Sequence, residues 1–448
     1  MMLSEVAKAL NTKLFGTDVP FTSVGGDTRN IVAGQLFVAL KGENFDGNTF
    51  AQEALKLGAV AVLVSDVAMQ VEPRIVVADT RLALGELAKY WREKFDMPVI
   101  AVTGSNGKTT TKEMLTAILS VTTQNRASVH ATYGNLNNDI GVPLTLLKMN
   151  QAHQYAVVEM GMNHLGEIDY LTHIAKPDIA LINNAGIAHI GELGSRENIA
   201  KAKGEIFAGL KADGVAVINV DSEYADYWKS LNPNRKIVTF GLKQPAEVGA
   251  NYEAFDSHSV IALTTPKGKL SMRLNVQGEH NVSNALAACA VAYALGVSLA
   301  DISRGLEAFT GVYGRLECKA GVNGAMVIDD TYNANPDSMK AAINVLAKHA
   351  GEKILVLGDM GELGLDAEKM HAEIGAYAKA CGLPTLYCLG DLSAIAVRAF
   401  GQGAEQFNSP EAIARAVLPA LKQGTTVLVK GSRFMQMERV VNLLVEKK

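Results

Sequence analysis

The stretch from Thr103 to Thr110, Thr-Gly-Ser-Asn-Gly-Lys-Thr-Thr, has the composition of a phosphate-binding loop. Its two glycines let the backbone turn tightly, so that successive N–H groups can point at one phosphate. Lys108 adds a full positive charge, and Thr109 adds a hydroxyl suited to Mg²⁺. The strict motif has a glycine where this chain has Val102, so the loop has a shorter Thr-Gly-x-x-Gly-Lys-Thr form. An ordinary strand-to-helix turn is the alternative, but the flanking pattern favours a nucleoside triphosphate site.

Two further residues that could carry charge chemistry follow apolar, strand-like segments. Glu159 ends one such segment and His189 comes shortly after the next. Ligands of parallel α/β sheets bind at the carboxyl ends of strands, where a carboxylate can hold Mg²⁺ and a histidine can contact metal or phosphate. A solvated residue at the rim of the sheet is the alternative for both, and for His189 the two interpretations stay open. Lys201 and Lys203 lie in the next helical segment, where the pattern alone favours a solvated face.

Later polar loops repeat the same theme. His280 and Asn281 begin a helix, although capping explains Asn281 equally well. Asp330 ends a strand, where a carboxylate could contact a ribose hydroxyl, and glycine-containing polar loops follow strands at 358–364 and 430–433. Several such loops at one sheet edge predict a large polar ligand that is held between domains.

The composition limits the class of protein. The 448 residues are enough for several domains, and 48% hydrophobic with 20% charged residues fits a globular protein with an ample core. The net charge of −4, without a dense basic run, argues against nucleic acid as a partner. The four cysteines form no Cys-x-x-Cys pair, and no apolar stretch approaches the length of a bilayer span. We therefore expect a cytoplasmic protein without membrane insertion.

The elements that must position these residues alternate between strand and helix, which indicates an α/β fold with mostly parallel sheets. We predict three consecutive α/β domains at 1–80, 81–311 and 312–448. The central one has a parallel sheet of the phosphate-loop ATPase type, and the last is Rossmann-like. The strands predicted in the central domain are Val99–Val102, Tyr155–Glu159, Ile179–Asn183, Val215–Asn219 and Ile237–Phe240, with an antiparallel hairpin at Ser259–Thr264 and Leu270–Asn275. Its predicted helices include Lys108–Leu119, Gly166–Ile174, Arg196–Leu210 and His280–Leu295.

Taken in this order, the motifs resemble the Mur ligases, the ATP-dependent amino-acid and peptide ligases of bacterial cell-wall synthesis. The stretches that carry the resemblance are Thr103–Thr110, Gly134–Pro143, Val158–Gly161, Ala188-His189, Ala202–Ile206, His280-Asn281, Tyr313–Glu317 and Lys430–Arg433. Asp330–Pro336 and Gly358–Gly364 are similar to the last domain of those members that join D-alanyl-D-alanine to a UDP-N-acetylmuramoyl-tripeptide. The resemblance implies that reaction, through an acyl phosphate, with ATP and Mg²⁺ as cofactors. It also implies a first domain for the uridine nucleotide, a central ATPase, a mobile last domain and a monomer.

The resemblance implies roles for individual residues as well. The UDP part of the substrate would lie near Asp27, Thr28, Arg29, Asn44, Phe45, Asp46 and Gly47. The remaining substrate contacts would be Asn135, Asn138, Tyr332, Asn333, Lys430, Ser432 and Arg433. ATP would be bound by Gly104, Ser105, Asn106, Gly107, Lys108, Thr109, Thr110, His280, Asn281, Arg315 and Asp330. The catalytic residues would be Lys108, Glu159, His189 and Lys203, and the metal ligands Thr109, Glu159, His189 and Lys203. Lys203 matches the lysine that many members carbamylate, which turns an amine into an anionic ligand.

Other functions remain as alternatives. The family member that adds the third amino acid carries an Asp-Asn-Pro-Arg motif in its last domain, whereas this chain has only Asn-Pro-Asn-Arg at 232–235, in the central domain. Folylpolyglutamate synthetase shares the central fold but lacks a first domain such as residues 1–80. A regulator or transport ATPase that hydrolyses ATP without ligation belongs to another class. A binding relative without catalysis is disfavoured by the intact Lys108, Thr109, Glu159 and His189.

Overall fold

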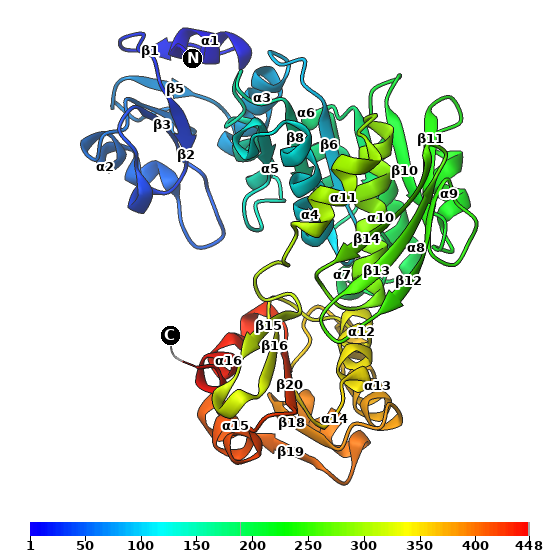
Figure 1. Ribbon diagram of the computed structural model, residues 1–448. Coiled ribbons are helices and arrows are strands. Elements are labelled where there is room, and N and C mark those ends of the chain that lie inside the picture. Colours follow the sequence, from blue (N-terminus) through cyan, green and yellow to red (C-terminus); the bar gives the residue numbers. More distant parts are fainter. Residues whose placement is uncertain (189, 447–448) are drawn as a thin grey trace.

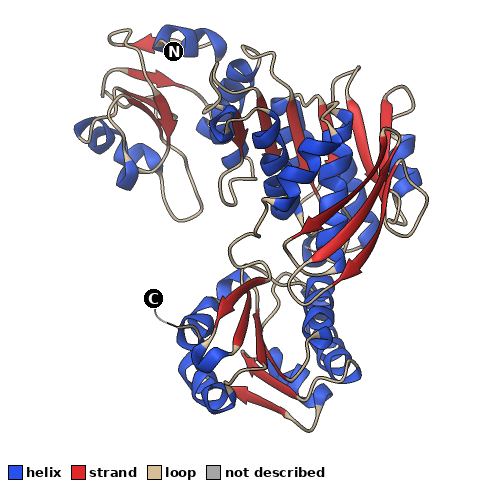
Figure 2. Ribbon diagram, in the orientation of Figure 1, coloured by secondary structure: helices blue, strands red, loops and turns tan. Residues whose placement is uncertain are grey.

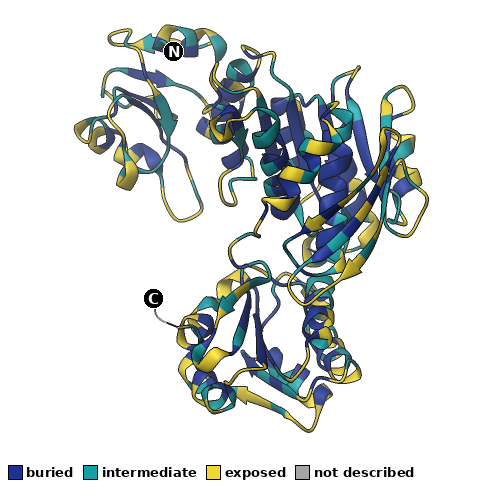
Figure 3. Ribbon diagram, in the orientation of Figure 1, coloured by how far each residue is buried: buried dark blue, intermediate teal, exposed yellow. Residues whose placement is uncertain are grey.

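The computed structural model describes residues 1–188 and 190–446, which form three α/β units in chain order (Figure 1). Each unit is built on its own sheet with helices packed against it (Figure 2). The predicted architecture of three consecutive α/β units is therefore confirmed. Figure 3 shows that the strands in the middle of each sheet are buried while the outward faces of the helices are exposed.

The first unit has a five-stranded sheet in the order β1-β5-β4-β3-β2. Its strands are β1 (Leu14–Phe15), β2 (Ser23–Gly25), β3 (Gln35–Val38), β4 (Ala61–Val64) and β5 (Arg74–Val76), and its helices are α1 (Leu3–Ala9) and α2 (Ala51–Lys56). Side chains alternate across the sheet as strand geometry requires. Leu36 and Val38 of β3 face the core that includes α1, whereas Phe37 faces the core that includes α2.

The central unit has a nine-stranded sheet in the order β14-β13-β12-β11-β10-β9-β6-β8-β7. Its strands are β6 (Val99–Thr103), β7 (Val129–Ala131), β8 (Tyr155–Glu159), β9 (Ile179–Ile182), β10 (Val215–Asn219), β11 (Lys236–Gly241), β12 (Val248–Ala254), β13 (Ser259–Thr265) and β14 (Gly268–Leu274). Its helices are α3 (Thr80–Arg92), α4 (Lys108–Thr122), α5 (Gly141–Leu146), α6 (Glu167–Ala175), α7 (Ile190–Leu193), α8 (Arg196–Gly204), α9 (Ala225–Ser230), α10 (Glu279–Ala294) and α11 (Leu299–Glu307).

The strands from β7 to β12 run parallel, and β13 and β14 extend the sheet in antiparallel fashion. The predicted hairpin is confirmed, and β12 joins it as a strand that periodicity did not reveal. Strand β6 shows why the sheet is covered on both sides. Ile100 and Val102 pack into a core with α4 and α10, whereas Val99 and Ala101 pack into a core with α6 and α8. Burial on both faces explains the continuous apolar runs of these strands.

The third unit has a six-stranded sheet in the order β15-β16-β20-β17-β18-β19, parallel except for β15. Its strands are β15 (Glu317–Ala320), β16 (Met326–Asp330), β17 (Glu352–Gly358), β18 (Thr385–Leu389), β19 (Ala404–Phe407) and β20 (Thr425–Lys430). Its helices are α12 (Pro336–Lys348), α13 (Ala367–Ala380), α14 (Ser393–Phe400), α15 (Pro410–Val417) and α16 (Glu438–Leu444). Helices α12 to α14 cover one face, and α15 and α16 cover the other.

Helix α3 connects the first unit to the central one. Leu84 and Leu87 pack into the core of the first sheet, and Ala88 packs into the central core. Asp79 caps the helix by accepting from the backbone N–H groups of Arg81 and Leu82 at 2.7 and 3.0 Å. Helix α3 (Thr80–Arg92) therefore contributes to two cores at once.

Candidate active site

A cleft of about 1190 Å³ lies between the central and third units, where strands of both sheets end. Its walls carry the loop after β6, the end of β8, the loop after β9, the start of α10 and the loops after β16 and β20. Both sheets direct the carboxyl ends of parallel strands toward the cleft, which is where α/β proteins bind ligands. The polar loops predicted at one sheet edge thus come from the edges of two sheets, and together they line one cleft.

The loop after β6 turns into α4 at Gly107, which caps the helix in the left-handed region with φ 78°. A Cβ at this residue would lie 2.1 Å from Asn284 Oδ1 and 2.6 Å from Asn183 Nδ2, so any other side chain would displace these two asparagines. Lys108 is the first residue of α4, and its Nζ donates to the Gly104 carbonyl at 2.8 Å. The loop thus places a cation and a helix N-terminus together, as a phosphate site requires.

The Lys108 ammonium sits in a partly desolvated place. Burial lowers the pKa of Lys108 below its ordinary value, while the nearby Glu159 carboxylate acts in the opposite direction. Register explains the proximity, because β6 and β8 are neighbours and Val102 pairs with Glu159. Glu159 is 2% exposed, so it belongs to the interior of the site and not to a solvated rim.

Thr109, Glu159 and Arg315 form the polar centre of the cleft. Thr109 Oγ1 donates to Glu159 Oε2 at 2.9 Å and accepts from Arg315 Nη2 at 3.0 Å. The other carboxylate oxygen of Glu159 accepts from Asn137 Nδ2 at 2.8 Å. The Arg315 guanidinium lies over the Tyr332 ring, with Cζ 4.1 Å from the centroid. Arg315 Nε is buried and has no acceptor among the described residues.

A network of hydrogen-bonded asparagine side chains supports the phosphate loop. Asn183 Nδ2 donates to Asn284 Oδ1 at 2.8 Å and to the Asn106 carbonyl at 2.9 Å. Asn281 Nδ2 donates to the Gln277 carbonyl at 2.7 Å, and Asn284 Nδ2 donates to Asn281 Oδ1 at 3.3 Å. Asn281 is 5% exposed and forms part of this support, in addition to lining the cleft.

Lys203 shows where the helical pattern misled. Lys201 is exposed as expected, but Lys203 is 1% exposed. Its Nζ has no hydrogen bond or ion pair with any described residue, and burial, together with the nearby Lys108 charge, holds the pKa of Lys203 well below its ordinary value. A solvated-face interpretation of Lys203 is therefore wrong. The buried amine loses its proton far more readily than a surface lysine does.

The third unit contributes a charge pair to the opposite wall. Asp330 and Lys430 end the adjacent strands β16 and β20 in register, and Lys430 Nζ lies 2.7 Å from Asp330 Oδ2. Lys430 also donates to the Asn333 carbonyl at 2.9 Å. Ser432 Oγ accepts from the Gly361 N–H at 2.8 Å, which connects the loops after β20 and β17. His280 lies in the same cleft, and burial lowers the pKa of its ring to about 4.

Other predicted residues have local partners. Asn138 Oδ1 accepts from the Gly141 N–H at 2.9 Å at the start of α5, and Asn135 lines the cleft. Arg433 lies at the rim of the cleft and pairs with Glu438 at 2.9 Å. The residue predicted to be a second metal contact, His189, lies outside the described residues.

The loops expected at the uridine nucleotide are not walls of this cleft. Asp27 accepts from the Arg29 N–H at 3.0 Å and pairs with its guanidinium at 2.9 Å, which lowers the pKa of Asp27 to about 2. Asp46 Oδ1 accepts from the Asn48 N–H at 2.9 Å, and this contact helps to hold the pKa of Asp46 below its ordinary value. Phe45 is 56% exposed. These residues, with the neighbouring Thr28 and Asn44, are exposed or half-buried in two loops of the first unit, whereas Gly47 is buried.

Sequence reasoning missed several side chains that the fold brings to the site. Asn137 contacts Glu159, Asn335 contacts the phosphate loop, and Asp337 Oδ2 accepts from the Ile187 N–H at 2.7 Å. A weak signal existed, because Asn137 stands in the asparagine-rich Asn135–Asn138 segment and Asn335 stands directly before a proline that begins a helix.

The donors present favour a hard cation bound through few protein ligands. The described residues contain no group of three or more histidine, cysteine, aspartate or glutamate side chains arranged for a metal. Thr109 Oγ1 and Glu159 Oε2 are 2.9 Å apart and supply two oxygens beside the phosphate loop. Mg²⁺ is commonly held in this way, with phosphate and water oxygens completing the shell. Among the described residues, no helix combines the length and hydrophobicity needed to cross a bilayer.

Comparison with known proteins agrees with this geometry. Family models match in chain order, namely the Mur ligase family catalytic domain at residues 20–92, the Mur ligase middle domain at 102–292 and the Mur ligase glutamate ligase domain at 314–433. The chain is 42% identical to the UDP-N-acetylmuramoyl-tripeptide–D-alanyl-D-alanine ligase of Escherichia coli K12, covering 99% of this chain and 98% of that protein.

Solved structures give the same result. A crystal structure of MurF from Acinetobacter baumannii superposes with a TM-score of 0.91 at 38% identity, covering 98% of this chain and 97% of that one. MurF ligase from Thermotoga maritima in complex with ADP superposes with a TM-score of 0.84 at 30% identity, covering 94% and 96%. With these matches along nearly the whole chain and a phosphate loop at the cleft between its sheets, the chain belongs to the Mur ligase family.

Proposed function

We propose that this chain is an ATP-dependent ligase that joins D-alanyl-D-alanine to a UDP-N-acetylmuramoyl-tripeptide. The observation that carries the proposal is the phosphate loop with its Thr109–Glu159 pair, set in a cleft that both the central and third units line. The full-length identity to ligases with that printed name supports the same reaction. A cleft between two units suits a reaction that must bring a nucleotide and two further substrates together.

The nucleotide occupies the phosphate-loop side of the cleft in this proposal. The N–H groups of residues 104–110 and the Lys108 ammonium surround the β- and γ-phosphates. Arg315 lines this side of the cleft and contacts the nucleotide, and Asp330 and the pair His280 and Asn281 line the adenosine end. Burial keeps the His280 ring neutral above pH 4, so it can act as a hydrogen-bonding group without a net charge.

Thr109 Oγ1 and Glu159 Oε2 are the described oxygens that would hold Mg²⁺. When bound there, the ion supplies neutralisation of the charge that builds on the transferring phosphoryl group. The Asn137 amide keeps the other carboxylate oxygen of Glu159 occupied, so that Oε2 stays directed at Thr109. His189 is a further proposed metal ligand.

Lys203 serves as a ligand after carbamylation in this proposal. Its amine is desolvated, and its lowered pKa favours the neutral form, which is the form that adds to carbon dioxide. The nitrogen lone pair attacks the carbon, one proton leaves the amine, and an anionic carbamate results. An anion there offsets the Lys108 charge, which in the unmodified chain helps to lower the pKa of Lys203.

The reaction proceeds in two transfers. An oxygen of the tripeptide's terminal carboxylate attacks the γ-phosphorus, ADP leaves, and an acyl phosphate forms. The amine of D-alanyl-D-alanine then attacks the carbonyl carbon, the tetrahedral intermediate expels phosphate, and the nitrogen loses a proton. Lys108 and the loop N–H groups stabilise the charge on the phosphoryl oxygens in both transfers. Closure of the third unit over the cleft excludes water, which would otherwise hydrolyse the acyl phosphate.

The remaining assignments follow the order of the units. We assign residues 1–80 to the uridine nucleotide, through the two loops around Asp27 and Asp46, residues 81–311 to ATP and residues 312–448 to the dipeptide. The substrate contacts are Asn135 and Asn138 for the sugar-peptide and Tyr332, Asn333, Lys430, Ser432 and Arg433 for the third unit's side. In this proposal the enzyme is a cytoplasmic monomer that uses ATP.

The test measures phosphate release from ATP and Mg²⁺ with UDP-N-acetylmuramoyl-tripeptide, with and without D-alanyl-D-alanine, while the product mass is followed. The proposal requires phosphate release and a gain of one dipeptide residue mass only in the complete mixture. Release without the dipeptide would indicate an ATPase without ligation. Use of a free amino acid in place of the dipeptide would indicate the ligase that adds the third residue.

A further inference from the structure

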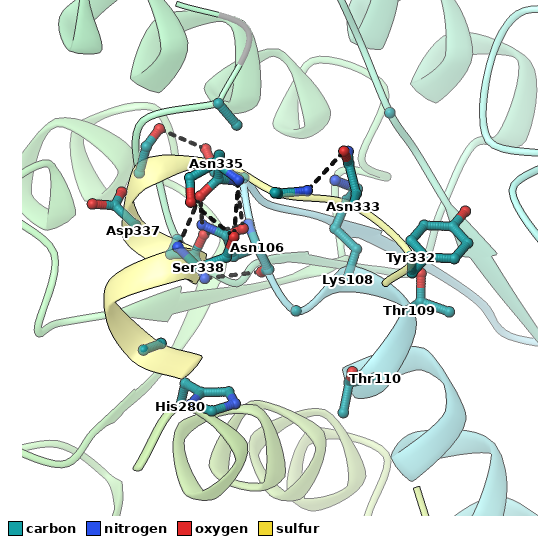
Figure 4. A pocket seen from close by; sticks show the side chains of 18 of the residues that line it. Asn106, Lys108, Thr109, Thr110, His280, Tyr332, Asn333, Asn335, Asp337 and Ser338 are labelled. Carbon is teal, nitrogen blue, oxygen red and sulfur yellow. Dashed lines mark hydrogen bonds between the residues drawn. The ribbon is translucent and has the colours of Figure 1, made fainter. Parts of the chain in front are cut away.

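A pair of asparagine side chains connects the phosphate loop to the third unit. Asn335 Nδ2 donates to Asn106 Oδ1 at 2.7 Å, and Asn106 Nδ2 donates back to Asn335 Oδ1 at 3.4 Å. The two residues are 229 positions apart in the chain and face each other across the cleft (Figure 4). In the 2.7 Å bond, the Asn335 amide nitrogen is the donor.

The main chain of Asn106 is held independently by the central unit. Its N–H donates to Asn184 Oδ1 at 2.9 Å, and its carbonyl accepts from Asn183 Nδ2 and Asn184 Nδ2 at 2.9 Å each. Only the side chain of Asn106 is therefore left for the third unit. Residues 105–107 form the turn of the phosphate loop, here called its crest. A contact that fixes the Asn106 side chain therefore also fixes the backbone that surrounds the phosphates.

Asn335 is mounted rigidly at the start of helix α12. Its Oδ1 accepts from the Ser338 N–H at 2.9 Å, and its own N–H donates to Ser338 Oγ at 3.0 Å, which forms a capping box. The cap uses the side-chain oxygen, so the amide nitrogen is available for Asn106. Asp337 in the same turn accepts from the Ile187 N–H at 2.7 Å, so this end of α12 contacts two loops of the central unit.

We infer that Asn335 is a positioning residue for the nucleotide, because it holds Asn106 and thereby the crest of the phosphate loop when the third unit is docked. This inference rests on the proposed function, since it takes ATP as the ligand of the loop. Coupling between two binding events is reciprocal. Docking of the third unit therefore strengthens nucleotide binding, and nucleotide strengthens docking, to the extent that the amide pair contributes.

Two variants separate the amide pair from the helix cap. Asn335→Ser keeps a good capping oxygen but has no group that reaches Asn106. Ser409→Ala is the matched control, because Ser409 caps α15 of the same unit by accepting from the Ala412 N–H at 3.1 Å and lies outside the cleft. Both full-length proteins are tested with a non-hydrolysable ATP analogue and Mg²⁺ by calorimetry, alongside thermal unfolding and steady-state kinetics.

The two variants are expected to change different measured quantities. Asn335→Ser raises the Kd of the analogue and the KM for ATP by about three- to tenfold, which is the net value of one hydrogen bond. It leaves the KM for the UDP-linked substrate and the melting temperature unchanged. Ser409→Ala lowers the melting temperature and leaves the Kd of the analogue unchanged.

A double-mutant cycle completes the test. In an Asn106→Ala background, Asn335→Ser causes no further loss of affinity, because its partner is already absent. A Kd within twofold of the unsubstituted protein, or an equal loss in both backgrounds, overturns the inference. If the unsubstituted protein binds the analogue but joins no dipeptide, the proposed reaction fails, while the Kd values still decide the role of Asn335.

Discussion

The hydroxyl of Thr109 is expected to be the most informative single atom in the site. It joins a carboxylate that is 2% exposed to the Arg315 guanidinium, through bonds of 2.9 and 3.0 Å. The change Thr109→Val keeps the shape of the side chain and removes both bonds, leaving Glu159 with Asn137 as its only remaining side-chain donor among the described residues. A hydrogen bond to a charged group contributes about 1.5–3 kcal/mol. The free energy of unfolding of the nucleotide-free protein should therefore fall by about 2 kcal/mol.

The same substitution should impair catalysis separately from stability. Without the hydroxyl, Glu159 is the only described oxygen ligand left for the cation. Turnover should fall by about 100-fold, the usual effect of losing one preorganised stabilising group. The Mg²⁺ concentration for half-maximal activity should rise by about tenfold. Urea unfolding and phosphate release at varied Mg²⁺ concentration measure the two effects.

Two controls make this prediction strict. Thr109→Ser keeps the hydroxyl and should preserve most of the activity. Thr111→Val makes the same chemical change two residues later, at a buried hydroxyl with no hydrogen-bond partner among the described residues, and should be neutral or stabilising. The reasoning is refuted if Thr109→Val is as stable as Thr111→Val and keeps near-normal turnover with an unchanged Mg²⁺ requirement.

Three further predictions follow from the structure. Gly107→Ala should abolish binding of an ATP analogue in calorimetry, because its Cβ would lie 2.1 Å from the asparagine network. Gly166→Ala is the control, since Gly166 caps a helix with φ 88° and has nothing within 4 Å. It should cost about 1 kcal/mol of stability and leave the affinity for the analogue unchanged. Lys203→Ala should lose ligation activity, and small carboxylic acids should partly restore it. Lys201→Ala, on the exposed face of the same helix, should keep full turnover. Equal effects of the two changes would contradict the argument from burial. Burial lowers the pKa of His130 from 6.5 to about 4. Between these values the unfolded chain binds a proton that the folded chain does not. The free energy of unfolding therefore falls by up to about 3 kcal/mol as the pH drops from 6.5 to 4. Denaturant unfolding at pH 7 and pH 4.5 should show a smaller pH dependence for His130→Gln, and an identical dependence would show that another group is responsible.

Local pattern was sufficient for the elements that carry the phosphate site. The apolar strand at 99–103, the glycine loop and the helix from Lys108 follow from periodicity and glycine chemistry, because both act over a few residues. The rule that ligands gather at the carboxyl ends of parallel strands was sufficient to group Glu159 and Asp330 with the loop. Strands β12, β15 and β19 are mostly half-buried or exposed and lack a continuous apolar pattern, so periodicity does not reveal them.

Burial at single positions depended on tertiary packing. Lys201 and Lys203 lie two residues apart in one helix, yet one is exposed and the other is buried. The polarity of the helix gave no indication of this difference, because the burial of a single position depends on how the whole chain packs. The resemblance to a known family assigned Lys203 a role, but only the packed structure supplies the desolvation that makes its amine unusual.

The amide contacts that fix the phosphate loop also separate what the local sequence determines from what the tertiary structure determines. The sequence by itself determined the loop, its cation and its hydroxyl, because neighbours along the chain define them. Only the tertiary structure decided that Asn106 meets Asn335 from 229 residues away and that Asn183 meets Asn284 from 101 residues away. Such pairs depend on how two sheets are ordered and docked, and the free energy of that docking is spread over whole cores of apolar side chains. A short motif holds the chemistry of one loop, whereas the geometry that aims the loop is a property of the entire fold.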